Sequence, residues 1–240
     1  MKLPPCPFVV LDTETTGFVP RVHKVIEFAS ARVENGEVAS EYETLCAIEG
    51  EIPPHVEVLT RIRTADLAGK PAFSACVADI GAHLGEGTLV VGQNVGFDIG
   101  MLKGEGLDLS ERPRLDTSML ASLVFPECRS FSLGYLSDVL GLPHAPRHRA
   151  LGDVRATTAL LGHCWERLCS LPKTHLAQAK DILGRSTPGY RMLAAALPDG
   201  TEGPVPDWLK RGRPAPERAE VTPRPLTCPE PGTVELREES

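Results

Sequence analysis

The chain lacks the features that mark membrane, secreted and zinc-binding proteins. Its 240 residues contain no apolar run that approaches the length of a membrane span. The first residues, MKLPPCPF, do not form the apolar segment of a signal peptide. Seven cysteines, an odd number, include no C-x-x-C pair, which argues against a disulfide framework and against a zinc site. We therefore expect a cytoplasmic protein that has no contact with a membrane.

An excess of basic residues is also missing. Acidic residues number 32 and basic residues 25, so the formal net charge is −7. This balance argues against a protein that coats nucleic acid through bulk electrostatic attraction. It does not exclude an enzyme that holds one end of a strand through metal ions. The composition thus permits a nuclease without indicating one.

Regular structure is expected over roughly the first 170 residues. Apolar patterning predicts strands at 8–11, 24–33, 38–45 and 88–92, with an Asn-Gly hairpin turn inside 34–37. Helical spacing predicts helices at 73–84, 97–107, 118–125, 132–140 and 150–168. Three antiparallel strands followed by alternating helices and strands indicate an α/β fold with a mixed β-sheet flanked by helices. This is the order of a ribonuclease-H-like fold, although other α/β folds share it.

The segment FVVLDTETTG, residues 8–17, places two acids at the end of an apolar strand. Residues i and i+2 of a strand point to the same face, so Asp12 and Glu14 aim their carboxylates at one spot. Like charges at that distance repel, and burying them unpaired is costly. We therefore expect a positive group between them.

Three later residues belong with this pair, although each has a simpler explanation. Asp98 follows a strand into the first turn of a helix, where an acid is commonly explained by the helix dipole. Asp153 lies early in the last long helix, and His148 precedes it by five residues. That spacing does not share one helix face, so His148 fits the preceding loop, where a lone histidine is usually just solvated. His144 fits no usable spacing and is set aside.

Taken in order, these residues resemble the motifs of the DnaQ-like, or DEDDh, 3′–5′ exonucleases. The first motif is LDTETTG, the second is N-x-x-F-D from Asn94 to Asp98, and the third is H-x-x-x-x-D from His148 to Asp153. The likeness extends over about residues 7–168 and includes IPP at 52–54 and LDTSMLA at 115–121. Each of these motifs is common by itself, whereas the complete set in this order is specific for the family.

The resemblance implies a fold, an activity and a set of ligands. It implies a ribonuclease-H-like domain that removes nucleoside 5′-monophosphates from single-stranded or frayed DNA 3′ ends in proofreading or repair, as proofreading subunits of bacterial replicative polymerases do. Four carboxylates would hold two divalent cations, Mg²⁺ or Mn²⁺: Asp12, Glu14, Asp98 and Asp153. His148 would act as the general base toward the attacking water.

Further residues would contact the substrate by the same resemblance. Those expected to hold the terminal nucleotide, a base or a phosphate are Thr15, Thr16, Gly17, Asn94, Phe97, Arg147 and Arg149. Core packing is an equal explanation for Phe97, and a solvated basic loop explains the two arginines. Two departures from the family pattern stand out: Gln93 replaces a common histidine, and LTRIRT at 59–64 adds charge where the family commonly shows LTGIT.

The division of the chain follows from these observations. Residues 1–170 are expected to form the exonuclease domain, residues 171–197 a short helical extension, and residues 198–240 a Pro-rich, flexible tail. The tail could carry a polymerase or sliding-clamp partner. Alternatives to DNA cleavage are RNA 3′-end trimming, as in ribonuclease T, hydrolysis of short oligonucleotides, and a non-catalytic interaction module. The complete set of carboxylates argues against the last of these.

Overall fold

The computed structural model describes residues 2–211 and contains one five-stranded mixed sheet. The strands are β1 (Phe8–Thr15), β2 (Val25–Glu34), β3 (Glu37–Leu45), β4 (Leu89–Gly92) and β5 (Arg114–Asp116). Their order across the sheet is β3-β2-β1-β4-β5. β1 pairs antiparallel with β2 and parallel with β4, so the central strand joins the hairpin half to the parallel half. The α/β fold with a mixed sheet is confirmed.

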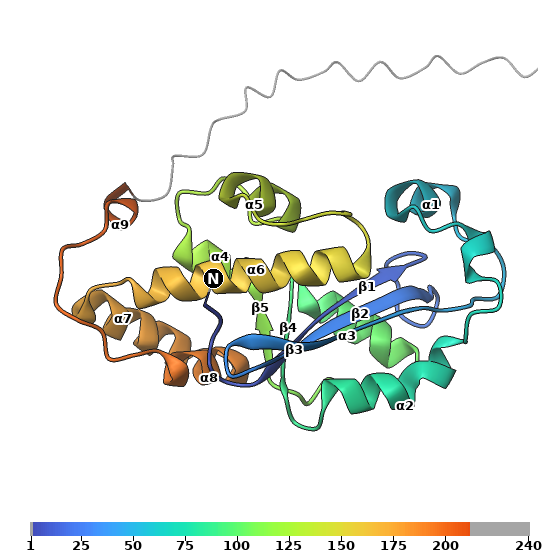
Figure 1. Ribbon diagram of the computed structural model, residues 1–240, viewed down its shortest axis with the longest axis horizontal. Coiled ribbons are helices and arrows are strands. Elements are labelled where there is room, and N and C mark those ends of the chain that lie inside the picture. The colour runs from blue at the N-terminus through green and yellow to red at the C-terminus, as the bar shows by residue number, and fades with distance from the viewer. Residues whose placement is uncertain (1, 212–240) are drawn as a thin grey trace, which may run out of the picture.

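Helices cover both faces of the sheet (Figure 1). On one face lie α2 (Phe73–Leu84) and α3 (Val95–Gly104), packed on side chains such as Val9 and Leu11 of β1. The other face carries α4 (Thr117–Val124), α5 (Leu133–Leu140) and α6 (Ala150–Cys169). Phe8 and Val10 belong to that second core. Because strand residues alternate between faces, Asp12 and Glu14 continue on the α6 face.

Four elements differ from the sequence prediction. α1 (Pro54–Thr60) begins where a Pro-rich turn was expected, and η1 (Thr64–Leu67), a 3₁₀ helix, follows it. The short strand β5 was not predicted. α3 begins two residues earlier than expected, directly after Asn94, whose backbone is left-handed with φ 57°.

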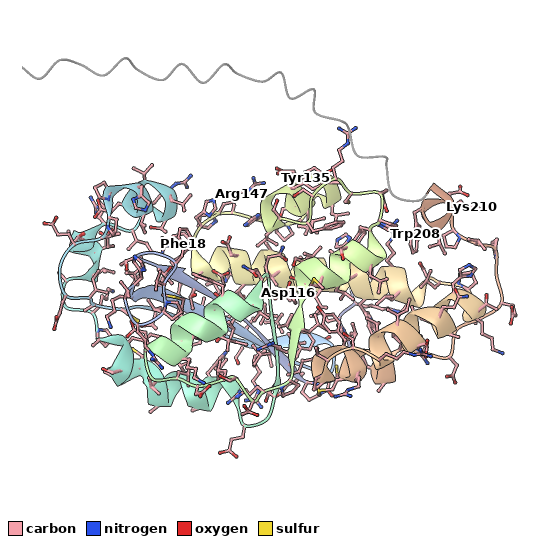
Figure 2. The ribbon with its side chains drawn as sticks, turned by 180° about the vertical axis from the view of Figure 1, so that it is seen from behind. Phe18, Asp116, Tyr135, Arg147, Trp208 and Lys210 are labelled. Atoms are coloured by element: carbon pink, nitrogen blue, oxygen red, sulfur yellow. The ribbon has the colours of Figure 1, made fainter. Side chains whose placement is uncertain are left out.

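Beyond the expected domain, α7 (Lys173–Gly184) and α8 (Pro188–Ala196) pack on the α6 face through Leu176, Leu183 and Leu193. Within the expected tail, residues 207–211 form α9 (Asp207–Arg211). Trp208 of α9 lies 3.9 Å from the Arg167 guanidinium of α6, measured to the ring centroid (Figure 2). The rest of the predicted tail, 212–240, lies outside the described residues. Among residues 2–211 there is no helix with the length and apolar character needed to cross a membrane.

Candidate active site

Three of the predicted carboxylates meet at the end of β1. The ligand atoms of Asp12, Glu14 and Asp153 all lie within 4.8 Å of one another. β1 supplies the first two from the face that α6 covers, and α6 supplies the third from its first turn. Strand alternation and helix position together therefore bring three of the four acids that the resemblance implied as ligands to one point.

A buried ion pair anchors the start of α6. Glu27, opposite Glu14 in the β1–β2 pairing, is fully buried and accepts a hydrogen bond from the Ala150 main-chain N–H at 2.8 Å. The Arg149 guanidinium donates to the same carboxylate from Nη2 at 2.6 Å and from Nε at 3.0 Å. Arg149, predicted to contact phosphate, thus has Glu27 as its partner. The pair fixes the first turn that carries Asp153 against the sheet.

Asp98 lies beside the three-acid cluster, and Thr13 of β1 holds its side chain. Its side chain is buried at the start of α3, and its Oδ1 accepts hydrogen bonds from the Thr13 N–H at 3.0 Å and the Thr13 Oγ1 at 2.7 Å. Its negative charge raises the pKa of Asp12, second only to the effect of burial. Asp98 therefore contributes charge to the site, while one of its oxygens is engaged by β1.

The electrostatics of the cluster favour a bound cation. Burial first, and then the charges of Asp153, Glu27 and Asp98, raise the pKa of Glu14 to about 8. Burial raises the pKa of Asp98 to about 7, against the hydrogen bonds from Thr13. The pKa values of Asp12 and Asp153 are also raised, chiefly by burial. An all-oxygen, mutually repelling donor set fits a hard divalent ion.

The two histidines of the loop before α6 contact Asp153 in different ways. His148 is exposed with φ 56°, and its main-chain N–H bonds to the Asp153 carboxylate. The side chain of His144 is only 6% exposed, and its Nε2 lies 2.6 Å from Asp153 Oδ1. Setting His144 aside on sequence spacing was wrong. The loop folds back over the helix, which helical spacing cannot reveal.

The loop before α6 can fold back onto this helix because a glycine lies where the loop and the helix come closest. Gly152 in the first turn of α6 lies so near the Pro146 carbonyl that a Cβ there would be 2.1 Å from the carbonyl oxygen. Only a glycine lets the loop pass at that distance. The loop arginine Arg147 pairs with Asp138 of α5, beside which it lies in Figure 2. This ion pair accounts for the position of the Arg147 side chain, and the contact with phosphate stays a prediction.

The loop after β1 begins with the predicted Thr-Thr-Gly. Thr15 Oγ1 donates to the Gly17 carbonyl at 2.7 Å, and Thr16 Oγ1 accepts from the Lys24 N–H at 2.9 Å. A Cβ on Gly17 would lie 2.3 Å from the His23 ring, so this position needs glycine because of close packing. The hydrogen bonds close the loop at its base.

Two aromatic rings stand at the rim of this loop. Phe18 is 82% exposed, and its ring centroid lies 6.2 Å from that of Phe97, which packs partly into the core. Phe18 was missed in the sequence, although its place directly after Gly17 was a usable signal. The pair offers an exposed apolar surface beside the loop that follows Glu14, with the two rings tilted by 55°.

The second motif is held by β5 and α4. The Asn94 N–H donates to Asp116 Oδ1 at 3.2 Å. Gln93, which departs from the family pattern, donates from Nε2 to the Phe131 carbonyl at 2.7 Å and accepts from Thr117 Oγ1 at 2.6 Å. Gln93 is thus a structural residue that ties the end of β4 to its neighbours.

The exonuclease family of the RNase T type matches this chain over residues 9–161, a span that contains all the acids described above. The chain belongs to this exonuclease family. The resemblance drawn from the three motifs is therefore confirmed.

Relatives and solved structures agree with this assignment. The 3′-5′ exonuclease DinG of Bacillus subtilis is 34% identical over 73% of this chain and 19% of its own length. The PolC-type DNA polymerase III of Thermotoga petrophila is 33% identical over 73% of this chain and 13% of its own length. The chain thus spans about a fifth or less of these two relatives.

Among solved structures, exonuclease X in complex with 5′ overhanging duplex DNA matches with a TM-score of 0.53 and 27% identity. That match covers 66% of this chain and 91% of exonuclease X. Escherichia coli exonuclease I in complex with a dT13 oligonucleotide matches with a TM-score of 0.58 over 75% of this chain and 44% of its own length. At 22% identity, the second likeness concerns the fold alone.

Proposed function

We propose that the protein is a metal-dependent 3′→5′ exonuclease that releases nucleoside 5′-monophosphates from single-stranded or frayed DNA 3′ ends. The observation that carries this proposal is the group of Asp12, Glu14 and Asp153 within 4.8 Å, in a chain of the exonuclease family. The direction of cleavage and the DNA substrate are supported by the 3′-5′ exonuclease DinG and by the DNA-bound exonuclease X.

The carboxylates would hold two divalent cations, Mg²⁺ or Mn²⁺, with Asp98 beside them. Ions held by these carboxylates would supply Lewis-acid activation of a water and neutralisation of charge on the phosphoryl oxygens. His148 would take the proton of that water, because its side chain is exposed on a loop whose main chain is bonded to Asp153. The water oxygen forms the new bond to phosphorus, the bond to the 3′-oxygen breaks, and that oxygen takes a proton from solvent.

The aromatic pair and the Thr-Thr-Gly loop would position the strand end. The Phe18 face is open to solvent and rests on Phe97, so a terminal base can stack on it. Thr15, Thr16 and Gly17 directly follow Glu14 in the chain, and Asn94 precedes the helix that carries Asp98. By the family resemblance, these four residues would contact the terminal nucleotide. The PolC relatives favour a polymerase as partner, as part of the same chain or as a separate one.

The direct test is a gel assay with 5′-labelled single-stranded DNA and matched RNA. Each is incubated with Mg²⁺, with Mn²⁺ and with chelator, beside an Asp12→Ala control that removes one ligand. We expect a metal-dependent ladder shortening from the 3′ end of DNA, absent in the control. Faster digestion of RNA would replace DNA with RNA as the substrate. No cleavage of either strand would favour a non-catalytic module.

A further inference from the structure

Arg61 has an unfavourable backbone conformation close to the candidate active site. It follows α1 with φ 59° and ψ 21°, in the left-handed region, where glycine is the favoured residue. Five non-glycine residues among 2–211 have positive φ, and one of the others, His148, lies on the loop that contacts Asp153. Residues held in disfavoured conformations concentrate at functional sites. The conformation itself closes the end of α1, because the Arg61 N–H donates to the Glu57 carbonyl at 2.8 Å. Glycine would end the helix with less strain, so the arginine in its place calls for an explanation through its side chain.

The side chain of Arg61 lines a cavity of about 340 Å³. The residues around this cavity are Leu45, Arg61, Ile62, Asp66, Lys70 and Arg149. The Asp66 carboxylate is already paired with the Arg63 guanidinium at 2.9 Å, and Arg149 is paired with Glu27. Arg61 and Lys70 are both exposed, and neither forms an ion pair with another residue in the described part of the chain. Two uncompensated positive charges thus remain at the cavity.

Arg149 connects this cavity to the acids. It lines the cavity, and its guanidinium is bonded to Glu27, which lies opposite Glu14 across the β1–β2 pairing. The Arg149 charge lowers the pKa of Glu14 and also that of Asp66, so it lies within electrostatic reach of both. A strand whose end reaches the acids can therefore pass the cavity.

We propose that Arg61 and Lys70 bind a backbone phosphate of the DNA strand, distinct from the phosphodiester that is cleaved at the carboxylates. A phosphate matches this cavity because guanidinium and ammonium groups are the usual partners of phosphate oxygens. The site compensates locally for a net charge of −7, which gives the protein no general attraction for nucleic acid. This inference rests on the proposed function and assigns part of its substrate contact.

The first test compares two double variants of the 240-residue protein. Arg61→Ala/Lys70→Ala removes the two cavity charges, and Lys173→Ala/Arg191→Ala removes two exposed charges from α7 and α8, at the opposite end of the molecule from α1 (Figure 1). Binding of a dye-labelled oligothymidine of about ten nucleotides is followed by fluorescence anisotropy in Ca²⁺, over a range of salt, with strand integrity checked on a gel. Thymidine 5′-monophosphate, as a competitor, reports the terminal site alone.

We expect the cavity variant to bind the oligonucleotide about tenfold more weakly. The slope of log affinity against log salt should fall by about 0.7 for each phosphate that the variant no longer neutralises. The control variant should keep an affinity and a salt slope closer to those of the unaltered protein. Competition by the mononucleotide should be unchanged in both double variants. Equal losses in both double variants would overturn the proposal. Equal loss of mononucleotide and oligonucleotide binding would overturn it too, because the charges would then serve the terminal site.

A second variant separates the conformation of Arg61 from its charge. Arg61→Gly relieves the left-handed backbone, so the thermal midpoint should rise by about 2–4 °C while oligonucleotide affinity falls. A more stable protein with unchanged affinity would overturn the role of Arg61. Since binding is measured without cleavage, a strand that binds but is never cut contradicts the proposed function and leaves the phosphate site standing.

Discussion

At the scale of single residues, Asp153 receives two contacts from one loop. The side chain of His144 contacts its Oδ1, and the main chain of His148 bonds to the same carboxylate. With one oxygen engaged by His144, the carboxylate has a fixed orientation toward Asp12 and Glu14. Residues that orient a metal ligand in this way affect metal affinity strongly. His144 is thus placed to position Asp153, whereas the exposed ring of His148 is the group that we propose as the base.

Replacing His144 should therefore weaken metal binding. We expect His144→Phe, which fills the space without a hydrogen-bond donor, to lower Mn²⁺ affinity by about 10–100-fold in calorimetry. His144→Gln keeps a donor near the position of Nε2 and should recover much of that loss. Equal affinity in the phenylalanine variant and the unaltered protein would show that the hydrogen bond only supports the fold.

Replacing His148 should affect the rate of catalysis and leave the affinity for metal nearly unaltered. His148→Ala removes the proposed base and should lower kcat by about 10²–10⁴-fold, with Mn²⁺ affinity nearly unchanged. Steady-state kinetics on single-stranded DNA and the same calorimetry report the two quantities. A parallel loss of metal affinity would instead assign His148 to holding Asp153.

At the scale of elements, the site depends on how closely the loop at 144–149 crosses α6. Gly152→Ala would place a methyl group 2.1 Å from the Pro146 carbonyl oxygen. The loop would have to move, at a cost of about 1–3 kcal/mol of stability, and carry both histidines away from Asp153. We expect lower stability in denaturant titration and a large loss of nuclease activity.

Gly81→Ala is the matched control, since nothing lies within 4 Å of its Cβ position on α2. It should stabilise the protein by up to about 1 kcal/mol through helix propensity alone. Equal activity in the Gly152 and Gly81 variants would mean that the loop position does not matter for the chemistry.

The elements also show which features were readable in the sequence. Asp12 and Glu14 were predicted together because strand alternation has a period of two and needs no distant information. Asn35 and Gly36 signalled the hairpin because their left-handed backbones, with φ 53° and 78°, favour those residue types. β5 was missed because three residues acquire strand structure only by pairing with β4.

Two features were not predicted from the sequence, each for a different reason: the start of α1 and the contact between His144 and Asp153. Pro54 stands in the first turn of α1, which is a known start signal that was taken for a turn. The contact of His144 with Asp153 spans nine residues through an irregular loop, so no periodic pattern encodes it. The partner of Arg149 was hidden for the same reason, because Glu27 is 122 residues away in the chain.

At the scale of the whole molecule, the acidic cluster links stability to pH and metal. The pKa of Glu14 is raised from 4.5 to about 8. Between those values the folded, metal-free protein binds more protons than the unfolded chain, so its stability should fall as the pH rises. Bound metal needs ionised ligands, so Mg²⁺ should raise the thermal midpoint more at about pH 8 than at about pH 6.

Differential scanning calorimetry with chelator and with Mg²⁺ measures both effects. The double variant Asp12→Asn/Glu14→Gln should show a flatter pH profile and little response to Mg²⁺. A metal-free midpoint that rises between about pH 6 and pH 8 would contradict the sign of this linkage.

Anomalous diffraction from crystals soaked in Mn²⁺ shows whether Asp12, Glu14 and Asp153 together bind the catalytic cation. We expect an anomalous peak within about 2.0–2.3 Å of oxygens from all three carboxylates, and no such peak in crystals of Asp12→Ala. Mn²⁺ bound elsewhere, with these carboxylates free of metal, would rule out their role as the ligands of the catalytic cation.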